Sequence, residues 1–204
     1  QTCALPILAR MDHPNIAAIF DAGTSAKGRP YFAMEYVEGS ALTAYCDEQR
    51  LPLGERLALF TQVCQAVDYC HQRGIIHRDL KPGNLLVTTH DGKPCVKVID
   101  FGLARAQDWH AFARAQLTGS AQIVGTPEYM SPEQAGGLET AVDRRTDVYA
   151  LGVVLYELVT GALPFAAEEW GARGAAEIIR VICQLDAPAP AERYSGLGGK
   201  REDR

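Results

Sequence analysis

Short apolar runs alternate with polar turns in the first half of the chain, whereas the second half carries longer apolar stretches. The short runs are bounded by Pro, Gly, Asn and Asp, which is typical of β-strands. The strands predicted in this way cover residues 17–22, 30–37, 85–87 and 96–99. Apolar residues three and four positions apart predict helices over 54–73, 146–160 and part of 168–185. The pattern therefore predicts an α+β protein.

The helix predicted over residues 54–73 is amphipathic and ends at Gly74. One apolar stripe consists of Leu57, Phe60, Cys64 and Val67, and an adjoining stripe consists of Leu59, Val63, Ala66 and Cys70. A shorter helix is predicted to begin at Ser40, whose hydroxyl can cap the first turn, and to run to about Gln49. Residues 195–204 are polar and are expected to form a tail.

The helix predicted over residues 146–160 is apolar almost all round, with no charged residue between Asp147 and Glu157. A helix without a polar face belongs in a protein core. Gly161 is expected to end it, and Pro164 prevents its continuation. The second half of the chain is therefore expected to pack around this helix.

The composition is that of an ordinary globular protein, with 47% hydrophobic and 22% charged residues. A net charge of −5 argues against a broad nucleic-acid-binding surface. No apolar run approaches the roughly 18–20 residues that span a bilayer, so no membrane segment is expected within this chain. The six cysteines form no C-x-x-C pair and are expected to be reduced. Reduced thiols favour a cytoplasmic location, with any membrane anchor outside these residues.

One polar segment, I-I-H-R-D-L-K-P-G-N at residues 75–84, concentrates groups suited to phosphoryl transfer. Such a reaction needs a carboxylate to orient the attacking hydroxyl, a cation to offset charge on the transferred group and an oxygen ligand for a metal. Asp79, Lys81 and Asn84 fit these roles in that order. The segment alone is weak evidence, since a polar loop can have this composition by chance.

A second motif follows after a predicted hairpin, whose turn carries the pair D-G. The return strand ends in Asp100-Phe101-Gly102. Two carboxylates and an amide, from Asp79, Asp100 and Asn84, make an oxygen-rich site that suits Mg²⁺ rather than zinc. The two motifs together make a chance match very improbable as an explanation.

The two motifs, H-R-D-x-x-x-x-N and D-F-G, resemble the catalytic loop and the metal-binding motif of protein kinases. The strings D-H-P-N-I, V-I-D-F-G-L-A and G-T-P-E-Y-M-S-P-E-Q-A are most similar to the eukaryotic-like serine/threonine protein kinases of bacteria. The resemblance covers about residues 8–197. It implies a protein-kinase-like fold, with a mostly helical C-lobe and a remnant of the N-lobe sheet. It also implies ATP-dependent transfer of phosphate to Ser/Thr of protein substrates, with ATP and Mg²⁺ as cofactors.

The resemblance assigns roles to individual residues of the nucleotide and catalytic sites. The catalytic residues are Asp79, Lys81 and Asn84, and the metal ligands are Asn84 and Asp100. Contacts to ATP are expected from the gatekeeper Met34, from the main chain of Glu35 and Val37, from Leu86 beneath the adenine and from Asp100 through the metal. Structural support is expected from His77, Phe101, Gly102 and Asp147, the last by holding the catalytic-loop backbone.

Residues 103–124 resemble an activation segment, in which Thr118 and Ser120 are the phosphorylation candidates. Arg78 is expected to receive that phosphate, because a guanidinium can bind two phosphate oxygens at once. In the substrate-binding loop, Thr126 is expected to reach Asp79 and Lys81. Glu133 belongs to an S-P-E variant of the family's A-P-E motif.

The resemblance divides the chain into four parts. Residues 1–7 are expected to be a non-native leader, with a divergent native terminus as the alternative. Residues 8–37 correspond to an N-lobe remnant, 38–197 to a C-lobe that is incomplete at its C-terminal end, and 198–204 to a polar tail. The family's glycine-rich phosphate loop, strand lysine and αC glutamate have no counterpart in the sequence. These 204 residues alone are therefore expected to be inactive and of low stability.

Two other functions remain open at this point. One is a pseudokinase, a regulatory binding module without transfer activity, although the intact Asp79, Lys81, Asn84 and Asp100 argue against a decayed site. The other is a small-molecule phosphotransferase of kinase-like fold. The segment G-T-P-E-Y-M-S-P-E argues against it, because the family uses this loop to position a peptide.

Overall fold

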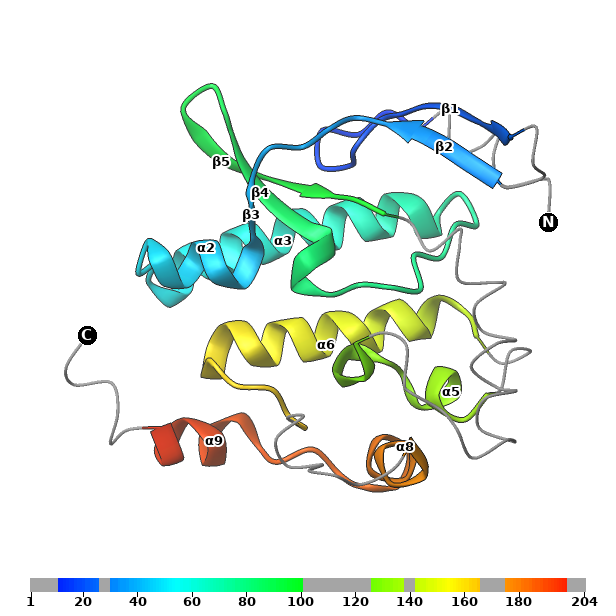
Figure 1. Cartoon of the computed structure of the whole chain (residues 1–204). Helices are drawn as coiled ribbons and strands as arrows, with labels where there is room; N and C mark the ends of the chain where they lie inside the picture. The colour runs from blue at the N-terminus through cyan, green and yellow to red at the C-terminus, as the bar shows by residue number, and fades with distance from the viewer. Residues whose placement is uncertain (1–10, 26–29, 101–125, 138–141, 166–174, 198–204) are drawn as a thin grey trace. The chain divides into compact units, whose positions relative to one another are not determined.

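The computed structural model describes residues 11–25, 30–100, 126–137, 142–165 and 175–197. Contacts divide the chain into two compact units. The first consists of Gln1–His77 with Pro82–Asp100, and the second consists of Arg78–Lys81 with Phe101–Arg204. The helices and strands of the described residues are labelled in Figure 1.

The first unit combines two small antiparallel sheets with helices (Figure 1). Its elements in chain order are β1 (Ile19–Thr24), β2 (Pro30–Met34), β3 (Ser40–Ala41), α2 (Leu42–Glu48), α3 (Leu53–His71), the 3₁₀ turn η1 (Pro82–Asn84), β4 (Leu85–His90) and β5 (Lys93–Val98). Strand β1 pairs with β2, and β3, β4 and β5 form the second sheet in that order. The predicted D-G turn joins β4 to β5, with Asp91 at φ 49° and Gly92 at φ 73°.

Helix α3 contacts β5, and its buried residues are the four of the second predicted stripe together with Val67 of the first. The buried residues are Leu59, Val63, Ala66, Val67 and Cys70. The prediction for Leu57 is wrong, since its side chain is 38% exposed, and Phe60 is only half-buried. Two apolar stripes lie side by side on this helix, and periodicity alone cannot say which one meets the sheet. The helix stops where expected, at the turn that Gly74 closes with φ 73°.

The start of α2 also differs from its prediction. Ala41 precedes the helix and no side chain caps it, whereas Ser40 lies in β3 and pairs with Val87. The backbones approach closely at this point, because a Cβ added at Gly39 would lie 2.5 Å from the carbonyl oxygen of Val87. The ladder between β3 and β4 therefore prevails over the local cap that Ser40 could form.

A buried asparagine ties the loop before β1 to both α3 and β5. Asn15 is 7% exposed, and its Nδ2 donates to Gln62 Oε1 at 3.0 Å and to Val96 O at 2.8 Å. Gln62 Oε1 also accepts from Val96 N at 2.9 Å. The carbonyl of Asn15 accepts from Val98 N at 2.8 Å. This network fixes the strand that leads directly to Asp100.

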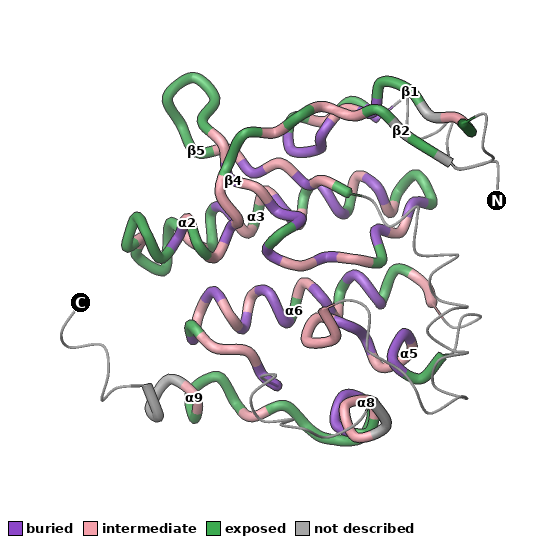
Figure 2. The backbone as a smooth tube through the Cα atoms, viewed as in Figure 1, coloured by how far each residue is buried: buried purple, intermediate pink, exposed green. Residues whose placement is uncertain are grey.

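The described part of the second unit is helical. Its elements are the 3₁₀ turn η2 (Pro127–Tyr129), α5 (Pro132–Ala135), α6 (Arg144–Thr160), α8 (Ala175–Gln184) and α9 (Pro190–Leu197). The Asp143 side chain caps α6 by accepting from Arg145 N, and the helix ends as predicted at Gly161, with φ 73°. Figure 2 shows buried residues along the whole length of α6, as its lack of charge predicted.

Helices α8 and α9 complete the described part of this unit. Ile178 of α8 packs against two clusters, one containing Met130, Ala135 and Ile182 and the other containing Phe165 and Val181. Helix α9 corrects the prediction of a polar tail from residue 195, because the helix continues to Leu197. Arg193 of α9 donates to Pro164 O at 3.2 Å.

A tyrosine–glutamate hydrogen bond ties η2 to α6. Tyr129 Oη donates to Glu157 Oε2 at 2.7 Å. Burial raises the pKa of Tyr129 well above its ordinary value, and the bond to Glu157 raises it further. The cause of the second effect is that ionisation of the hydroxyl would place two negative charges in contact.

The five described cysteines are free of disulfides, in agreement with the expected reduced state of these residues. Across the described ranges, no helix combines the length and the apolar character that crossing a membrane requires.

Replacing Asn15 with Leu should lower the free energy of unfolding by about 1–3 kcal/mol, because Val96 O loses the Nδ2 donor and Gln62 Oε1 keeps only the bond from Val96 N. Urea unfolding followed by circular dichroism measures this loss. Thr61→Val is the control, since the Thr61 hydroxyl lies on an exposed part of α3 and bonds to Leu57 O one turn earlier. Its change should stay within about 0.5 kcal/mol. Equal losses in the two variants would contradict the anchoring role of Asn15.

Tyr129→Phe should destabilise the protein at neutral pH and less so at alkaline pH. A raised pKa in the folded state means that the stabilisation is complete below the tyrosine pKa of about 10 in the unfolded chain. It is lost progressively as the pH rises above that value. The difference in unfolding free energy between the wild type and Tyr129→Phe should therefore shrink between about pH 9 and pH 11, as measured by urea titrations. A constant difference would show that the hydroxyl is not buried against Glu157.

Candidate active site

The catalytic-loop segment, which belongs to the second unit, contains one residue in an unusual backbone conformation. Arg78 has φ 67°, in the left-handed region that residues other than glycine rarely adopt. Its N–H donates to Asp147 Oδ1 at 2.8 Å, which is the contact expected of Asp147. Its carbonyl accepts from Gln134 Nε2 at 2.8 Å. Side chains from α6 and α5 thus hold both peptide groups of the residue before Asp79.

Asp79 and Lys81 form an ion pair within the same segment. Lys81 Nζ lies 3.0 Å from Asp79 Oδ2, with the two side chains 24% and 12% exposed. Leu80 between them is 1% exposed. A carboxylate in this position can accept the hydrogen bond of an attacking hydroxyl, and the ammonium beside it offers positive charge to a phosphoryl group.

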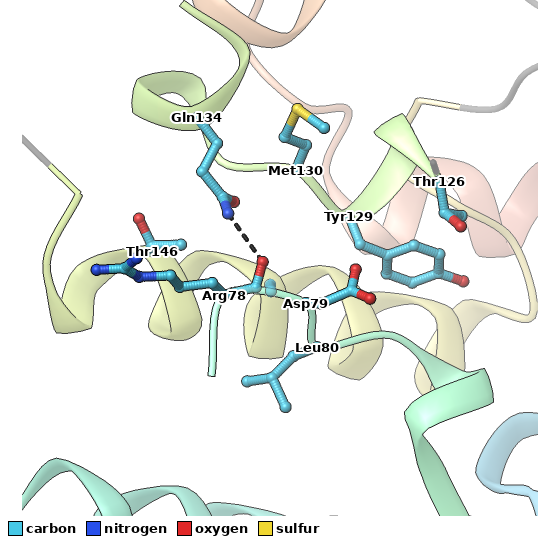
Figure 3. A pocket seen from close by; sticks show the side chains of 9 residues that line it. Arg78, Asp79, Leu80, Thr126, Tyr129, Met130, Gln134 and Thr146 are labelled. Carbon is cyan, nitrogen blue, oxygen red and sulfur yellow. Dashed lines mark hydrogen bonds between the residues drawn. The ribbon is translucent and has the colours of Figure 1, made fainter. Parts of the chain in front are cut away.

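Asp79 lines a pocket that is built from the second unit (Figure 3). The pocket residues come from the catalytic loop, from the segment around η2 and from α5 and α6: Arg78, Asp79, Leu80, Thr126, Tyr129, Met130, Gln134, Thr146 and Ala150. Thr126 and Asp79, which were predicted to work together, therefore lie on the same pocket. A hydroxyl group of a substrate that entered this pocket would meet the Asp79 carboxylate.

The S-P-E segment is fastened to the first turns of α5 and α6. Ser131 is fully buried and caps α5 in a capping box with Gln134. Ser131 Oγ lies 3.2 Å from Thr146 Oγ1, and Thr146 Oγ1 in turn donates to Glu133 Oε1 at 2.6 Å. Glu133, a predicted site residue, is thereby tied to α6 through a threonine.

The candidate metal ligands lie in the first unit. Asn84 is 6% exposed and ends η1, and its carbonyl accepts from Ile99 N at 3.0 Å. Asp100, which follows Ile99 in the chain, is exposed and has φ 57°. The buried His77 places Nε2 3.0 Å from Ile99 O. A carbonyl can only accept, so His77 donates in this contact and supports the strand end that presents Asp100.

This donor set fits Mg²⁺. The Asp100 carboxylate and the Asn84 side-chain amide oxygen are both hard oxygen ligands. Their backbone segments are joined by the hydrogen bond from Ile99 N to Asn84 O. Protein sites for Mg²⁺ commonly supply one or two such groups and leave the other positions to water and phosphate oxygens. Among the described residues, no group of three or more His, Cys, Asp or Glu side chains is placed to hold a metal ion by itself.

The residues predicted to contact adenine also lie in the first unit. Met34, Glu35 and Val37 are half-buried, and Leu86 is half-buried in β4, where it pairs with Ala41. The structure therefore brings the predicted nucleotide and metal residues together in one unit. The predicted residues Asp79, Lys81, Thr126, Glu133 and Asp147 lie in the other.

The Glu35 side chain has a role that the sequence did not suggest. Its Oε2 accepts from Ala18 N at 3.0 Å and from Lys97 Nζ at 3.1 Å. Burial alone raises the pKa of Glu35, but these two bonds outweigh it, and the pKa is lowered from its ordinary value. The carboxylate therefore stays ionised and links the segment after β2 to β5.

Several predicted residues lie outside the described part of the chain. They are Phe101, Gly102, Thr118 and Ser120. Arg78, the predicted receiver of a phosphate, has an exposed side chain. The expected approach of Asp79 to Asp100 involves both units and stays a prediction.

Comparison with known proteins supports the kinase resemblance. The chain matches the family model of the protein kinase domain over residues 5–195. It is 41% identical over 208 residues to serine/threonine-protein kinase Pkn1 of Myxococcus xanthus, and 42% identical over 193 residues to serine/threonine-protein kinase PknB of Mycobacterium tuberculosis. Each match covers 93% of this chain but only 29% of the relative.

A solved structure gives the same result for the fold. The crystal structure of the PknI kinase domain of Mycobacterium tuberculosis, determined as a double mutant, matches with a TM-score of 0.61 and 28% identity. The match covers 97% of this chain and 76% of that chain. The expected protein-kinase-like α+β fold is confirmed. The catalytic-loop geometry, the family match over residues 5–195 and this fold lead to one conclusion: the chain belongs to the protein kinase domain family and resembles its bacterial serine/threonine members.

Proposed function

We propose that this chain is part of the catalytic domain of a serine/threonine protein kinase, which transfers the γ-phosphate of ATP to Ser/Thr hydroxyls of proteins. The observation that carries the proposal is the backbone at Arg78, held by Asp147 and Gln134, which presents Asp79 beside Lys81. Phosphoryl transfer demands mainly positioning and electrostatic stabilisation from a protein, and a fixed carboxylate next to a cation supplies both.

The residues of the two units have different roles in this proposal. Asp79 orients the acceptor hydroxyl and Lys81 offsets charge on the transferred phosphoryl group, while Thr126 belongs to the wall that receives the peptide. Asn84 and Asp100 are the residues that would hold Mg²⁺. When bound, the ion neutralises charge on the phosphates.

The adenine site in this proposal is formed by Met34, Leu86 and the main chain of Glu35 and Val37. The Glu35 carboxylate keeps that main chain in place through Ala18 and Lys97. Because the segment is held by a side chain, its backbone groups can face a nucleotide without rearranging.

The domain division also stays part of the proposal, with an N-lobe portion at residues 8–37 and a C-lobe portion at residues 38–197. Arg78 is the proposed receiver of a phosphate on Thr118 or Ser120.

The chain spans 29% of the relatives Pkn1 and PknB, so the activity is proposed for the natural protein that contains it, in the cytoplasm.

Asp79→Asn should reduce phosphate transfer by about 100-fold or more, since it removes the group that accepts the hydroxyl proton. The assay follows radiolabelled γ-phosphate from ATP into a generic protein substrate, with the longest natural protein that contains these residues. Asp68→Asn, an exposed position on α3, is the matched control and should retain activity within about twofold. Nucleotide binding without any transfer by a well-folded wild type would instead favour a regulatory pseudokinase.

Asp100→Asn should weaken binding of Mn²⁺, used as a probe for Mg²⁺, by about tenfold or more in the presence of ADP, because a charged ligand is lost. Electron paramagnetic resonance of the free ion measures the change. Asp91→Asn is the control, since Asp91 is also exposed and also has positive φ, at 49°. Asparagine tolerates this backbone conformation, so neither variant should disturb the fold. Unchanged Mn²⁺ affinity in Asp100→Asn would remove Asp100 from the metal site.

A further inference from the structure

Gln134 is a buried amide that makes hydrogen bonds at both of its ends. Its side chain is 7% exposed, its Oε1 accepts from Ser131 N at 3.2 Å, and its Nε2 donates to Arg78 O at 2.8 Å. Figure 3 shows the side chain extending from α5 to the catalytic loop. Since the oxygen faces a donor and the nitrogen faces an acceptor, the amide cannot rotate by half a turn without losing both bonds.

The carbonyl that Gln134 binds belongs to a backbone that needs external support. A residue other than glycine in the left-handed region costs about 1–3 kcal/mol and keeps that conformation only where its surroundings fix it. Asp147 fixes the N–H side of Arg78. Gln134 fixes the other side, the peptide group that joins Arg78 to Asp79. This peptide sets the N–Cα bond of Asp79, and with it the point from which the Asp79 side chain extends.

We propose that Gln134 is a positioning residue for phosphoryl transfer, whose amide fixes the Arg78–Asp79 peptide and thereby aims the Asp79 carboxylate. This inference rests on the proposed kinase activity. Gln134 itself need not touch substrate, since its effect passes through the backbone of Arg78. A misplacement of about 1 Å in a reacting group can cost on the order of 100-fold in rate, so a single peptide orientation has a large effect.

The same amide couples the two walls of the pocket. Its oxygen is held by Ser131 N, at the end of the segment that contains Thr126, Tyr129 and Met130. Its nitrogen is held by the catalytic loop. Displacement of the substrate-side wall would therefore pull the amide away from Arg78 O and release Asp79.

The substitution Gln134→Glu tests the hydrogen bond to Arg78 O separately from the bond that caps α5 at Ser131 N. The ionised Glu side chain has the same shape and keeps the oxygen that Ser131 N requires, but it has no donor for Arg78 O. In the longest natural protein that contains this chain, kcat should fall at least tenfold, while KM for ATP and for a peptide substrate stays within threefold. Thr160→Val is the stability control, because it breaks buried hydrogen bonds at the far end of α6, to Tyr156 O and Ala162 O. It should leave kcat within twofold despite a lower melting temperature.

Three results would overturn the proposal: a kcat of Gln134→Glu within threefold of the wild type, a loss carried by KM alone, or an equal loss of kcat in Thr160→Val. Should Gln134→Glu fail to fold, Gln134→Asn replaces it, since the amide is kept but is one methylene too short to reach Arg78 O; the same loss of kcat is expected.

A measurement on the unmodified protein needs neither variant. The side-chain amide protons of Gln134 should exchange with water at least tenfold more slowly than those of the exposed Gln65. Equal exchange rates would overturn the proposal. The variant Asp79→Asn distinguishes failure of the proposed kinase activity from failure of the proposed role of Gln134. If it keeps full activity, the proposed function fails; if it abolishes activity while Gln134→Glu does not lower kcat, only the role of Gln134 fails.

Discussion

The second unit depends on one buried carboxylate. Asp147 is 0% exposed, and it accepts the N–H of Arg78 at 2.8 Å. A carboxylate removed from water is costly unless hydrogen bonds replace its hydration. Asp147 lies in the first turn of α6, where free backbone N–H groups and the helix dipole also favour negative charge. The start of α6 and the path of the catalytic loop are therefore determined together, because moving either one would break the hydrogen bond between Asp147 and Arg78.

Elements that follow from local chemistry were predicted correctly from the sequence. Gly74 and Gly161 end their helices in the left-handed conformation, and the helix that contains Asp147 was recognised from its lack of charge. The errors arose where tertiary contacts override a local preference. Ser40 could cap a helix, but it pairs with Val87 because the strand ladder offers its backbone more hydrogen bonds. Leu57 is apolar and correctly spaced, but the neighbouring stripe of α3 is the one that meets β5.

The candidate catalytic residues could be named from motif spacing, whereas the groups that hold them could not. Gln134 is 56 positions from Arg78, and Lys97 is 62 positions from Glu35. Periodicity and propensity contain no information about which distant side chains meet, so such pairs require the fold. One local signal was available: Ser131 and Gln134 are spaced as in a capping box, which indicates that the Gln134 amide turns back toward the loop.

Two of the described residues with a strained, left-handed backbone are Arg78 and Asp100, which both belong to the candidate active site. Among the described residues other than glycine, positive φ occurs at Arg50, Arg78, Asp91 and Asp100. Arg50 and Asp91 lie in tight turns, where reversal of the chain explains the conformation. Arg78 and Asp100 lie instead at the catalytic-loop carboxylate and at the candidate metal ligand, and each costs about 1–3 kcal/mol to maintain. Strain of this kind clusters at active sites, ligand clamps and switch regions. The two strained positions therefore agree with a site that aims the Asp79 carboxylate and holds a metal ion at Asp100, as the kinase proposal requires.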